Sequence, residues 1–167
     1  ICVQKFLDLD VTWTVANNGS VGLALHAKRN TVFPELPRFG LRLFLPQEMS
    51  QVNYYGMGPM ECYRDKHHAA SHSSYTATVW QLHEDYIRPQ ENGSHFDCDY
   101  VMLAGDAVRL TAVGTQPFSF NASHYTQEEL TRKAHNYELE PCGSTVLCLD
   151  YAQNGIGSES CGPRLLE

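Results

Sequence analysis

The fold class is signalled most clearly by the stretch Leu7-Asp8-Leu9-Asp10-Val11-Thr12-Trp13-Thr14-Val15, in which apolar and polar side chains alternate without a break. Successive side chains of a strand point to opposite faces, so a period of two predicts a β-strand with one apolar face. Asn17-Asn18-Gly19 then favours a turn with positive φ, and Val21, Leu23 and Leu25 resume the alternation. The chain is therefore predicted to begin with a β-hairpin.

Further short strands are predicted along the rest of the chain, separated by glycine and proline. They cover residues 39–45, 51–55, 75–82, 97–103, 107–113, 118–120 and 144–151. One short helix is expected near residues 126–136, because Thr126-Gln127-Glu128-Glu129 has the form of a capping box. In such a box Thr126 accepts from the Glu129 amide and the Glu129 side chain reaches back. Many strands and one helix predict an all-β, antiparallel sandwich, with a single domain over residues 1–165.

The composition argues against several classes of function. The 167 residues are 43% hydrophobic and 19% charged, as in a globular domain. The net charge of −7 argues against a nucleic-acid or anionic-membrane partner. No apolar run approaches the roughly eighteen residues that a membrane span needs. We therefore expect no nucleic-acid partner and no membrane.

The two ends of the sequence suggest an excerpt of a longer protein. Ile1-Cys2-Val3 has neither an initiator methionine nor a signal-peptide pattern, and Leu166-Glu167 resembles a tag scar. The cysteines are widely spaced and form no Cys-x-x-Cys pair, so we expect reduced and mostly buried thiols. They are Cys2, Cys62, Cys98, Cys142, Cys148 and Cys161.

The glycine-rich loop Asn154–Pro163 superficially resembles a phosphate cradle. A dinucleotide fingerprint needs a helix directly after the glycines, whereas here Pro163 follows and no helical pattern remains. Phosphate binding is therefore disfavoured. The loop is either a tight structural turn or a surface shaped to meet a ligand or partner, because glycine lets the backbone approach closely.

Two other groups of residues allow a chemical and a structural interpretation. His67, His68 and His72 could bind a metal, but no Cys or acid completes a usual spacing, which favours a solvated loop. The acids Glu61, Asp65 and Glu91 lie in loops and could form a hydrolase pair with separated pKa values. The preferred alternative makes them acceptors that pin their loops to Arg64, Lys66 or backbone amides.

Several ordered motifs resemble the small-chain-like C-terminal (fifth) domain of glycoside hydrolase family 2 β-galactosidases. They are Leu36-Pro37-Arg38-Phe39-Gly40-Leu41, Asn53-Tyr54-Tyr55-Gly56-Met57-Gly58-Pro59-Met60-Glu61-Cys62-Tyr63-Arg64-Asp65-Lys66, Pro89-Gln90-Glu91-Asn92-Gly93, Phe118-Ser119-Phe120-Asn121-Ala122-Ser123-His124-Tyr125, and Asp150 through Pro163. The motif-loop residues that carry the resemblance are Gly58, Pro59, Glu61, Tyr63, Asp65, Pro89, Glu91, Asn92 and Gly93.

The resemblance implies a galactose-mutarotase-like antiparallel supersandwich that is truncated at both ends in this chain. It implies a parent enzyme, a retaining β-galactosidase that hydrolyses terminal β-D-galactosides such as lactose. The catalytic glutamates and a Mg²⁺ site would then belong to a TIM-barrel domain of the same parent chain. We accordingly expect no catalytic residue, metal or cofactor in this fragment, and no activity from it alone.

The resemblance also implies a role for the last loop, which would close the rim of the barrel's active site against the galactoside. Its residues would be Gly157, Ser158, Glu159, Ser160, Cys161 and Gly162. In the best-known bacterial member a tryptophan of this loop is a sugar platform. Here Cys161 falls at or next to the aromatic position, and the loop is one residue shorter. A thiol has less apolar area, so a weaker platform is expected.

Two alternatives stay open from the sequence. The chain could be a stand-alone carbohydrate-binding or aldose-epimerase-like module, in which His67 or His83 would converge with Glu91. It could also be a structural oligomerisation module. For a β-galactosidase parent we expect a homo-oligomer and a cytoplasmic location, or a periplasmic one if a signal precedes Ile1.

Overall fold

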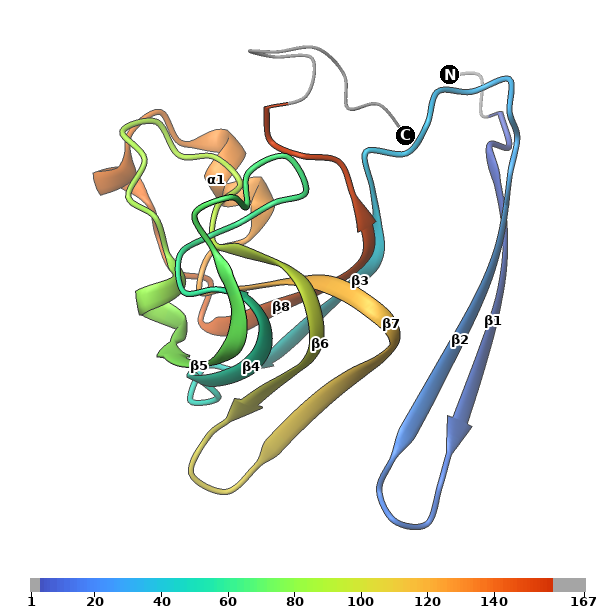
Figure 1. Ribbon diagram of the computed structural model, residues 1–167. Helices are drawn as coiled ribbons and strands as arrows, with labels where there is room; N and C mark the ends of the chain where they lie inside the picture. The colour runs from blue at the N-terminus through green and yellow to red at the C-terminus, as the bar shows by residue number, and fades with distance from the viewer. Residues whose placement is uncertain (1–3, 158–167) are drawn as a thin grey trace. The chain divides into compact units, whose positions relative to one another are not determined.

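Antiparallel strands joined by turns and loops make up most of the computed structural model, which describes residues 4–157 (Figure 1). The chain divides into two compact units, Ile1–Leu36 and Pro37–Glu167, and each has its own sheet. The predicted all-β class is thus confirmed. The prediction of one domain over residues 1–165, and of a supersandwich, remains a prediction.

The first unit contains the predicted hairpin. Strand β1 (Leu7–Val15) pairs antiparallel with β2 (Val21–Arg29), with Trp13 opposite Leu23 and Val11 opposite Leu25. Gly19 has a φ of +84° in the connecting turn, a conformation that glycine adopts without steric cost. The alternation in the sequence therefore placed both the strands and their shared apolar face correctly.

The second unit is a six-stranded antiparallel sheet in the order β3-β8-β7-β6-β4-β5 (Figure 1). The strands are β3 (Arg38–Pro46), β4 (Gln51–Gly58), β5 (Ser71–Thr78), β6 (Ser94–Ala104), β7 (Arg109–Ser123) and β8 (Ser144–Gln153). Its buried face carries alternate residues of the central strands, as the period of two requires. The core includes Val52, Tyr54, Val101, Leu103, Phe120, Ala122 and Leu147.

The predicted strands differ from the structure in two places. The strand predicted over 75–82 is β5 followed by a 3₁₀ turn, η1 (Val79–Leu82), and the polar residues 71–74 belong to β5 instead of a loop. Thr78 ends the strand because its hydroxyl accepts from the Gln81 amide while the Gln81 side chain accepts from the Thr78 amide.

The two strands predicted at 107–113 and 118–120 are one strand, β7. Its pairing with β6 passes from Val113 opposite Tyr100 to Phe118 opposite Cys98, so the four residues 114–117 of β7 face the single residue Asp99 of β6, and β7 has three extra residues. The strand absorbs these residues as an irregularity and continues, as at a β-bulge. Gly114 and Pro117 suggested that one strand ends and another begins here. In the structure only the register of the pairing with β6 changes.

The predicted helix is α1 (Gln127–Arg132), followed by a 3₁₀ turn, η2 (Asn136–Glu138). The Thr126 side chain accepts from the Glu129 amide at 3.1 Å, as predicted. The reciprocal half of the capping box was wrong, because the Glu129 carboxylate accepts instead from the Glu140 amide at 3.1 Å. Within residues 4–157, no helix has the length and apolar character to cross a membrane.

Three connections meet at one end of the six-stranded sheet. They are the β4–β5 loop (residues 59–70), the segment between η1 and β6 (residues 83–93), and the residues after β8 (154–157). The Cys62 amide donates to the Ser94 carbonyl at 2.8 Å, and the Asn154 amide donates to the Pro37 carbonyl at 2.9 Å. Apart from Gly58, at the end of β4, the predicted motif-loop residues lie in the first two stretches, and Gly157 of the predicted rim lies in the third.

Candidate functional site

Glu61 joins the first two of these connections. Its carboxylate is buried and accepts from Lys66 Nζ at 2.6 Å, from the Gly93 amide at 2.8 Å and from the Tyr86 hydroxyl. Burial alone raises the pKa of the Glu61 carboxyl, but these three donors outweigh it and hold that pKa below its usual range. Glu61 is therefore held ionised and pins the β4–β5 loop to the segment before β6.

Gly93 is adapted to this junction by its backbone. Its φ of +69° is left-handed, and a Cβ there would meet the carbonyl oxygen of Leu82. Next to it, the Asn92 side chain accepts from the Glu84 amide at 3.0 Å, and the Asn92 carbonyl accepts from Asn121 Nδ2. The Pro89–Gly93 motif is thus anchored to β7 as well as to Glu61.

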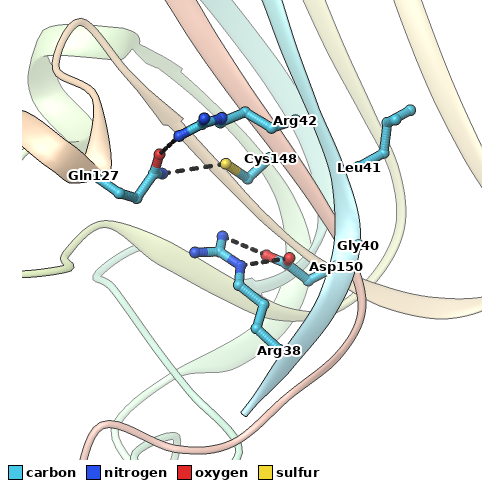
Figure 2. Close-up of a pocket in the computed structure, with 7 residues that line it drawn as sticks. All are labelled: Arg38, Gly40, Leu41, Arg42, Gln127, Cys148 and Asp150. Atoms are coloured by element: carbon cyan, nitrogen blue, oxygen red, sulfur yellow. Dashed lines mark hydrogen bonds and ion pairs between the residues drawn. The ribbon is translucent and has the colours of Figure 1, made fainter. Parts of the chain in front are cut away.

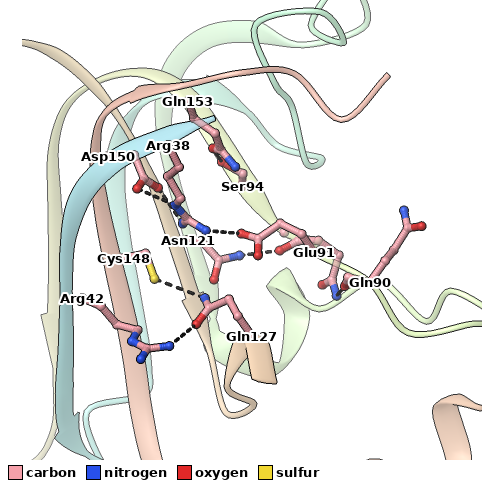
Figure 3. A network of polar contacts seen from close by, with 12 residues as sticks. Arg38, Arg42, Gln90, Glu91, Ser94, Asn121, Gln127, Cys148, Asp150 and Gln153 are labelled. Atoms are coloured by element: carbon pink, nitrogen blue, oxygen red, sulfur yellow. Dashed lines mark hydrogen bonds and ion pairs between the residues drawn. The ribbon is translucent and has the colours of Figure 1, made fainter. Parts of the chain in front are cut away.

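Glu91 belongs to a second network, around Arg38 at the start of β3 (Figure 3). The guanidinium of Arg38 donates to both carboxylate oxygens of Asp150, at 2.6 Å each, and to Glu91 at 2.9 Å. Asp150 is only 2% exposed, and a bidentate pair of this kind is among the stronger charge-assisted contacts. Burial raises the pKa of Glu91 although Arg38 opposes that shift.

The opposite pKa shifts of Glu61 and Glu91 are those of a hydrolase pair, but the contacts favour a structural role. Each carboxylate is bound to a cation of its own, Lys66 or Arg38, and Arg38 is also held by Asp150. The preferred interpretation, loop-pinning, is supported by these contacts. The partner of Glu91 differs from the prediction, since it is Arg38 and not Arg64 or Lys66.

A hollow of about 300 Å³ lies beside the Arg38 network (Figure 2). It is lined by Arg38, Gly40, Leu41, Arg42, Gln127, Cys148 and Asp150. Gln127 connects its walls, donating to Cys148 Sγ at 3.2 Å and accepting from Arg42 at 3.0 Å. Burial raises the pKa of the Cys148 thiol to about 11, which keeps it protonated and unreactive. Arg38 is paired with Asp150 and Arg42 with Glu128, so both cations of the hollow already have carboxylate partners. The contacts of Gln127 join α1 to β3 and β8 across it.

Asp65 joins the β4–β5 loop to the third connection. Its Oδ2 accepts from the Gly157 amide at 2.8 Å, and a Cβ on Gly155 would collide with its carboxylate. The other oxygen, Oδ1, is buried and has no hydrogen-bond partner within the described part of the chain. This contact is the described portion of the predicted rim. The remaining predicted rim residues, Ser158, Glu159, Ser160, Cys161 and Gly162, lie outside the described residues.

The histidines have separate surroundings. His67 stacks on His68 and lies against Phe96, whereas His72 bonds the Asp97 carbonyl at 2.9 Å. Residues 4–157 contain no group of three His, Cys, Asp or Glu side chains placed to hold a metal ion.

The histidine–Glu91 pair of the epimerase-like alternative is not formed among the described residues. His83 lies near Asp85 and Tyr125, and His67 bonds the Tyr63 carbonyl. The contact that Glu91 makes is with Arg38. The geometry therefore lends no support to that alternative.

The thiols agree with the sequence prediction where they are described. Cys62, Cys98 and Cys148 are buried and free, and Cys142 is free and exposed. Burial raises the pKa of the Cys62 thiol above its ordinary value. Cys2 and Cys161 lie outside the described residues.

Some residues that build this region had no role assigned from the sequence. Arg38 and Asp150 lay inside quoted motifs, but they are separated by 112 positions and are joined only because β3 pairs with β8. Nothing in the sequence around Tyr86 predicts a role for it, because its hydroxyl meets the buried carboxylate of Glu61 only in the folded chain. In the sequence Gly155 is one glycine of a glycine-rich loop, and only the fold brings it against Asp65.

Comparison with known proteins identifies the region as part of a known enzyme family. The family model described as "Beta galactosidase small chain" matches residues 2–167. The chain is 48% identical over 161 residues to a β-galactosidase of Actinobacillus pleuropneumoniae, covering 96% of this chain and 16% of that protein. A Staphylococcus xylosus β-galactosidase is 43% identical over 157 residues, covering 94% of this chain and 16% of that protein.

An Arthrobacter β-galactosidase is 37% identical over 134 residues, covering 76% of this chain and 13% of that protein. The chain thus spans about one sixth of the length of the relatives it matches. These matches confirm the resemblance that the Gly58–Lys66 and Pro89–Gly93 motifs indicated. The chain belongs to the β-galactosidase small-chain family.

Proposed function

We propose that the chain is the C-terminal, non-catalytic domain of a glycoside hydrolase family 2 β-galactosidase that cleaves terminal β-D-galactosides such as lactose. Its partner would be a TIM-barrel domain of the same parent chain, which would carry the two catalytic glutamates and Mg²⁺. The fold would be the family's supersandwich, in a homo-oligomeric, cytoplasmic enzyme, or a periplasmic one if the parent is exported. The six-stranded sheet would support the loop at residues 157–162, which closes the active-site rim.

The observation that carries this proposal is the use made of the loop carboxylates. Retaining hydrolysis needs two carboxyl groups that face a common sugar, about 5–5.5 Å apart. Glu61 is bound by Lys66, Tyr86 and the Gly93 amide, and Glu91 by Arg38. These acids fasten loops to one another, which is what a domain needs if it supports a rim instead of performing the chemistry.

The test compares this chain with the complete enzyme. We expect no turnover of a chromogenic β-galactoside by the purified chain, and activity when it is mixed with the complementary upstream portion. Turnover by the chain alone would contradict the proposal, and tight galactose binding by it would favour the stand-alone sugar-binding module.

In the complete enzyme, replacing Cys161 tests the rim directly. A Cys161→Trp variant should lower KM for aryl galactosides, because an indole offers a larger apolar face than a thiol. A Cys161→Ala variant should raise KM slightly. Unchanged KM values in both variants would argue against a rim role for this loop.

A further inference from the structure

Trp80 is a large aromatic side chain that the fold places at the surface. Its neighbours in η1, Val79 and Leu82, are buried together, because side chains three positions apart in a 3₁₀ turn lie on the same side. Trp80 points away from them and is 50% exposed. The turn begins with the reciprocal hydrogen bonds of Thr78 and Gln81. The indole is therefore presented by an element that the core and a capping box hold in place.

One side of the indole is covered by the residues that follow β7. His124 is 3% exposed, its ring centroid lies 4.6 Å from that of Trp80, and its Nδ1 lies 3.3 Å from the Ser144 carbonyl oxygen. The Tyr125 ring stands edge-on to the indole, at 6.0 Å and 79°. No group of the described residues accepts a hydrogen bond from the indole N–H. The indole thus has one packed side and one open side.

A carboxylate is fixed beside this aromatic pair. The His83 ring lies 5.0 Å from the Tyr125 ring, and its Nε2 lies 3.4 Å from Asp85 Oδ1. Asn136 Nδ2 donates to the same oxygen at 2.8 Å. The Asp85 side chain is nevertheless 78% exposed, so it can accept further hydrogen bonds from the solvent side. We call Trp80, Tyr125 and Asp85 together the Trp80 platform.

The platform suits a sugar ring better than a protein surface. A protein that covered Trp80 would also desolvate the Asp85 carboxylate, with which no lysine or arginine of the described residues pairs. Charged residues of this kind are depleted in the cores of protein interfaces. A pyranose has C–H groups on one face and hydroxyls at its edge. It can therefore stack on the indole while a hydroxyl donates to the carboxylate.

We propose that the Trp80 platform binds a β-galactosyl residue of an oligosaccharide or polysaccharide. The C–H face of the sugar packs on the open side of the indole, and one of its hydroxyls donates to Asp85. The choice of a galactosyl residue rests on the proposed function, because a β-galactosidase works among galactosides. With one aromatic face and one carboxylate for a single sugar, the dissociation constant should be about 1–10 mM.

The experiment is affinity electrophoresis of the complete β-galactosidase in native gels with increasing soluble β-1,4-galactan. Most galactosyl residues of this polymer are internal, whereas an enzyme for terminal galactosides takes chain ends. Galactan should slow the wild-type enzyme. Trp80→Ala should raise the dissociation constant about tenfold or more, because the stacking face is lost. Asp85→Ala should raise it about three- to fivefold, because one charge-assisted hydrogen bond is lost.

A matched control separates this effect from the general loss of an exposed aromatic ring. Tyr151 lies on β8, outside the platform, and is 63% exposed. Tyr151→Ala should be slowed by galactan as much as the wild-type enzyme. The melting temperature of each variant shows whether it is folded. Because Asp85 is exposed, Asp85→Ala keeps the test decisive if Trp80→Ala does not fold.

Two results would overturn the inference. The first is a wild-type enzyme that galactan does not slow, as expected if another part of the parent covers Trp80. The second is equal slowing of the wild-type enzyme, Trp80→Ala and Asp85→Ala, which would place galactan binding elsewhere.

Failure of the inference can be told from failure of the proposed function by assaying a chromogenic β-galactoside in parallel. Turnover by the complete enzyme without slowing by galactan overturns the inference and leaves the proposed function standing. Slowing that depends on Trp80 and Asp85, without turnover of β-galactosides, supports the platform and contradicts the proposed function.

Discussion

Glu61 and Asp65 lie four positions apart on the same loop and use their carboxylates in opposite ways. Glu61 is buried, accepts from Lys66, Tyr86 and the Gly93 amide, and joins two parts of the domain. Asp65 is half-buried, accepts from one backbone amide and leaves its other oxygen unpaired among the described residues. The difference separates an acid that stabilises the fold through several donors from an acid that makes one contact with the residues after β8.

The largest expected effect on stability is that of replacing Glu61. Glu61→Ala would leave the buried Gly93 amide without its acceptor and would remove the charge that holds Lys66. We expect the local opening free energy of residues 59–66 to fall by about 3 kcal/mol, a cost typical of breaking a buried pair. Hydrogen exchange of the complete enzyme measures this quantity directly.

The control for Glu61→Ala is Asp106→Ala, which replaces an exposed acid of the turn between β6 and β7 and should leave protection unchanged. A loss of opening free energy below about 0.5 kcal/mol at residues 59–66 would mean that Glu61 contributes no more than a surface residue. Water would then replace its carboxylate as the acceptor. The contrast with Asp65 would then disappear.

The next largest effect is a pH dependence of stability that arises from His95, a buried histidine close enough to Glu61 to feel its charge. His95 is 1% exposed, its Nδ1 lies 3.0 Å from the Tyr54 hydroxyl, and burial lowers its pKa to about 4. The unfolded chain takes up the proton near pH 6.5, so the folded state binds fewer protons between about pH 6.5 and 4. Stability should therefore fall as the pH falls through that window, by about 2–3 kcal/mol.

Below that window the Glu61 carboxyl should add to the loss. Its folded pKa is depressed, so its contribution is complete above the unfolded value of about 4.3 and is lost on further acidification. Hydrogen exchange of β6, corrected for the intrinsic pH dependence, is the measurement. A His95→Phe variant should flatten the curve between pH 6.5 and 4, and an equally steep curve in that variant would rule out His95 as the source.

A smaller change sharpens the comparison by removing one donor. Tyr86→Phe deletes the hydroxyl that donates to Glu61 but keeps the aromatic ring and the ion pair between Lys66 and Glu61. Because Glu61 retains its other donors, we expect a loss of about 1 kcal/mol in the opening free energy of residues 59–66. A loss as large as that of Glu61→Ala would show that Tyr86, and not the set of donors, holds the loop.

The smallest effect on stability is expected at Asp65. Asp65→Ala removes one hydrogen bond to Gly157 and also a buried oxygen without a partner, and these two terms oppose each other. The opening free energy of residues 59–66 should change by less than about 0.5 kcal/mol, while exchange at Gly157 becomes faster. A loss of several kcal/mol would place Asp65 with Glu61 as a stabilising residue and remove the comparison.

The sequence by itself determined the all-β class, the first hairpin, the cap of α1 and the family. Each depends on local information: the alternation over Leu7–Val15, a glycine at a turn, Thr126 three residues before Glu129, and motifs read in order. It also located the acids in loops and favoured pinning over catalysis. It misjudged the end of β5 and the unity of β7, because side-chain capping and a ladder irregularity override local composition.

Only the tertiary structure decided which residues meet. Arg38 and Asp150 contact because β3 pairs with β8, and Glu61 receives the Gly93 amide because two loops converge beside β6. Asp65 and Gly157 are separated by 92 positions and share no pattern in the sequence. Contacts of this kind follow from strand order and register, which are set by packing of the whole sheet and not by any short stretch of residues.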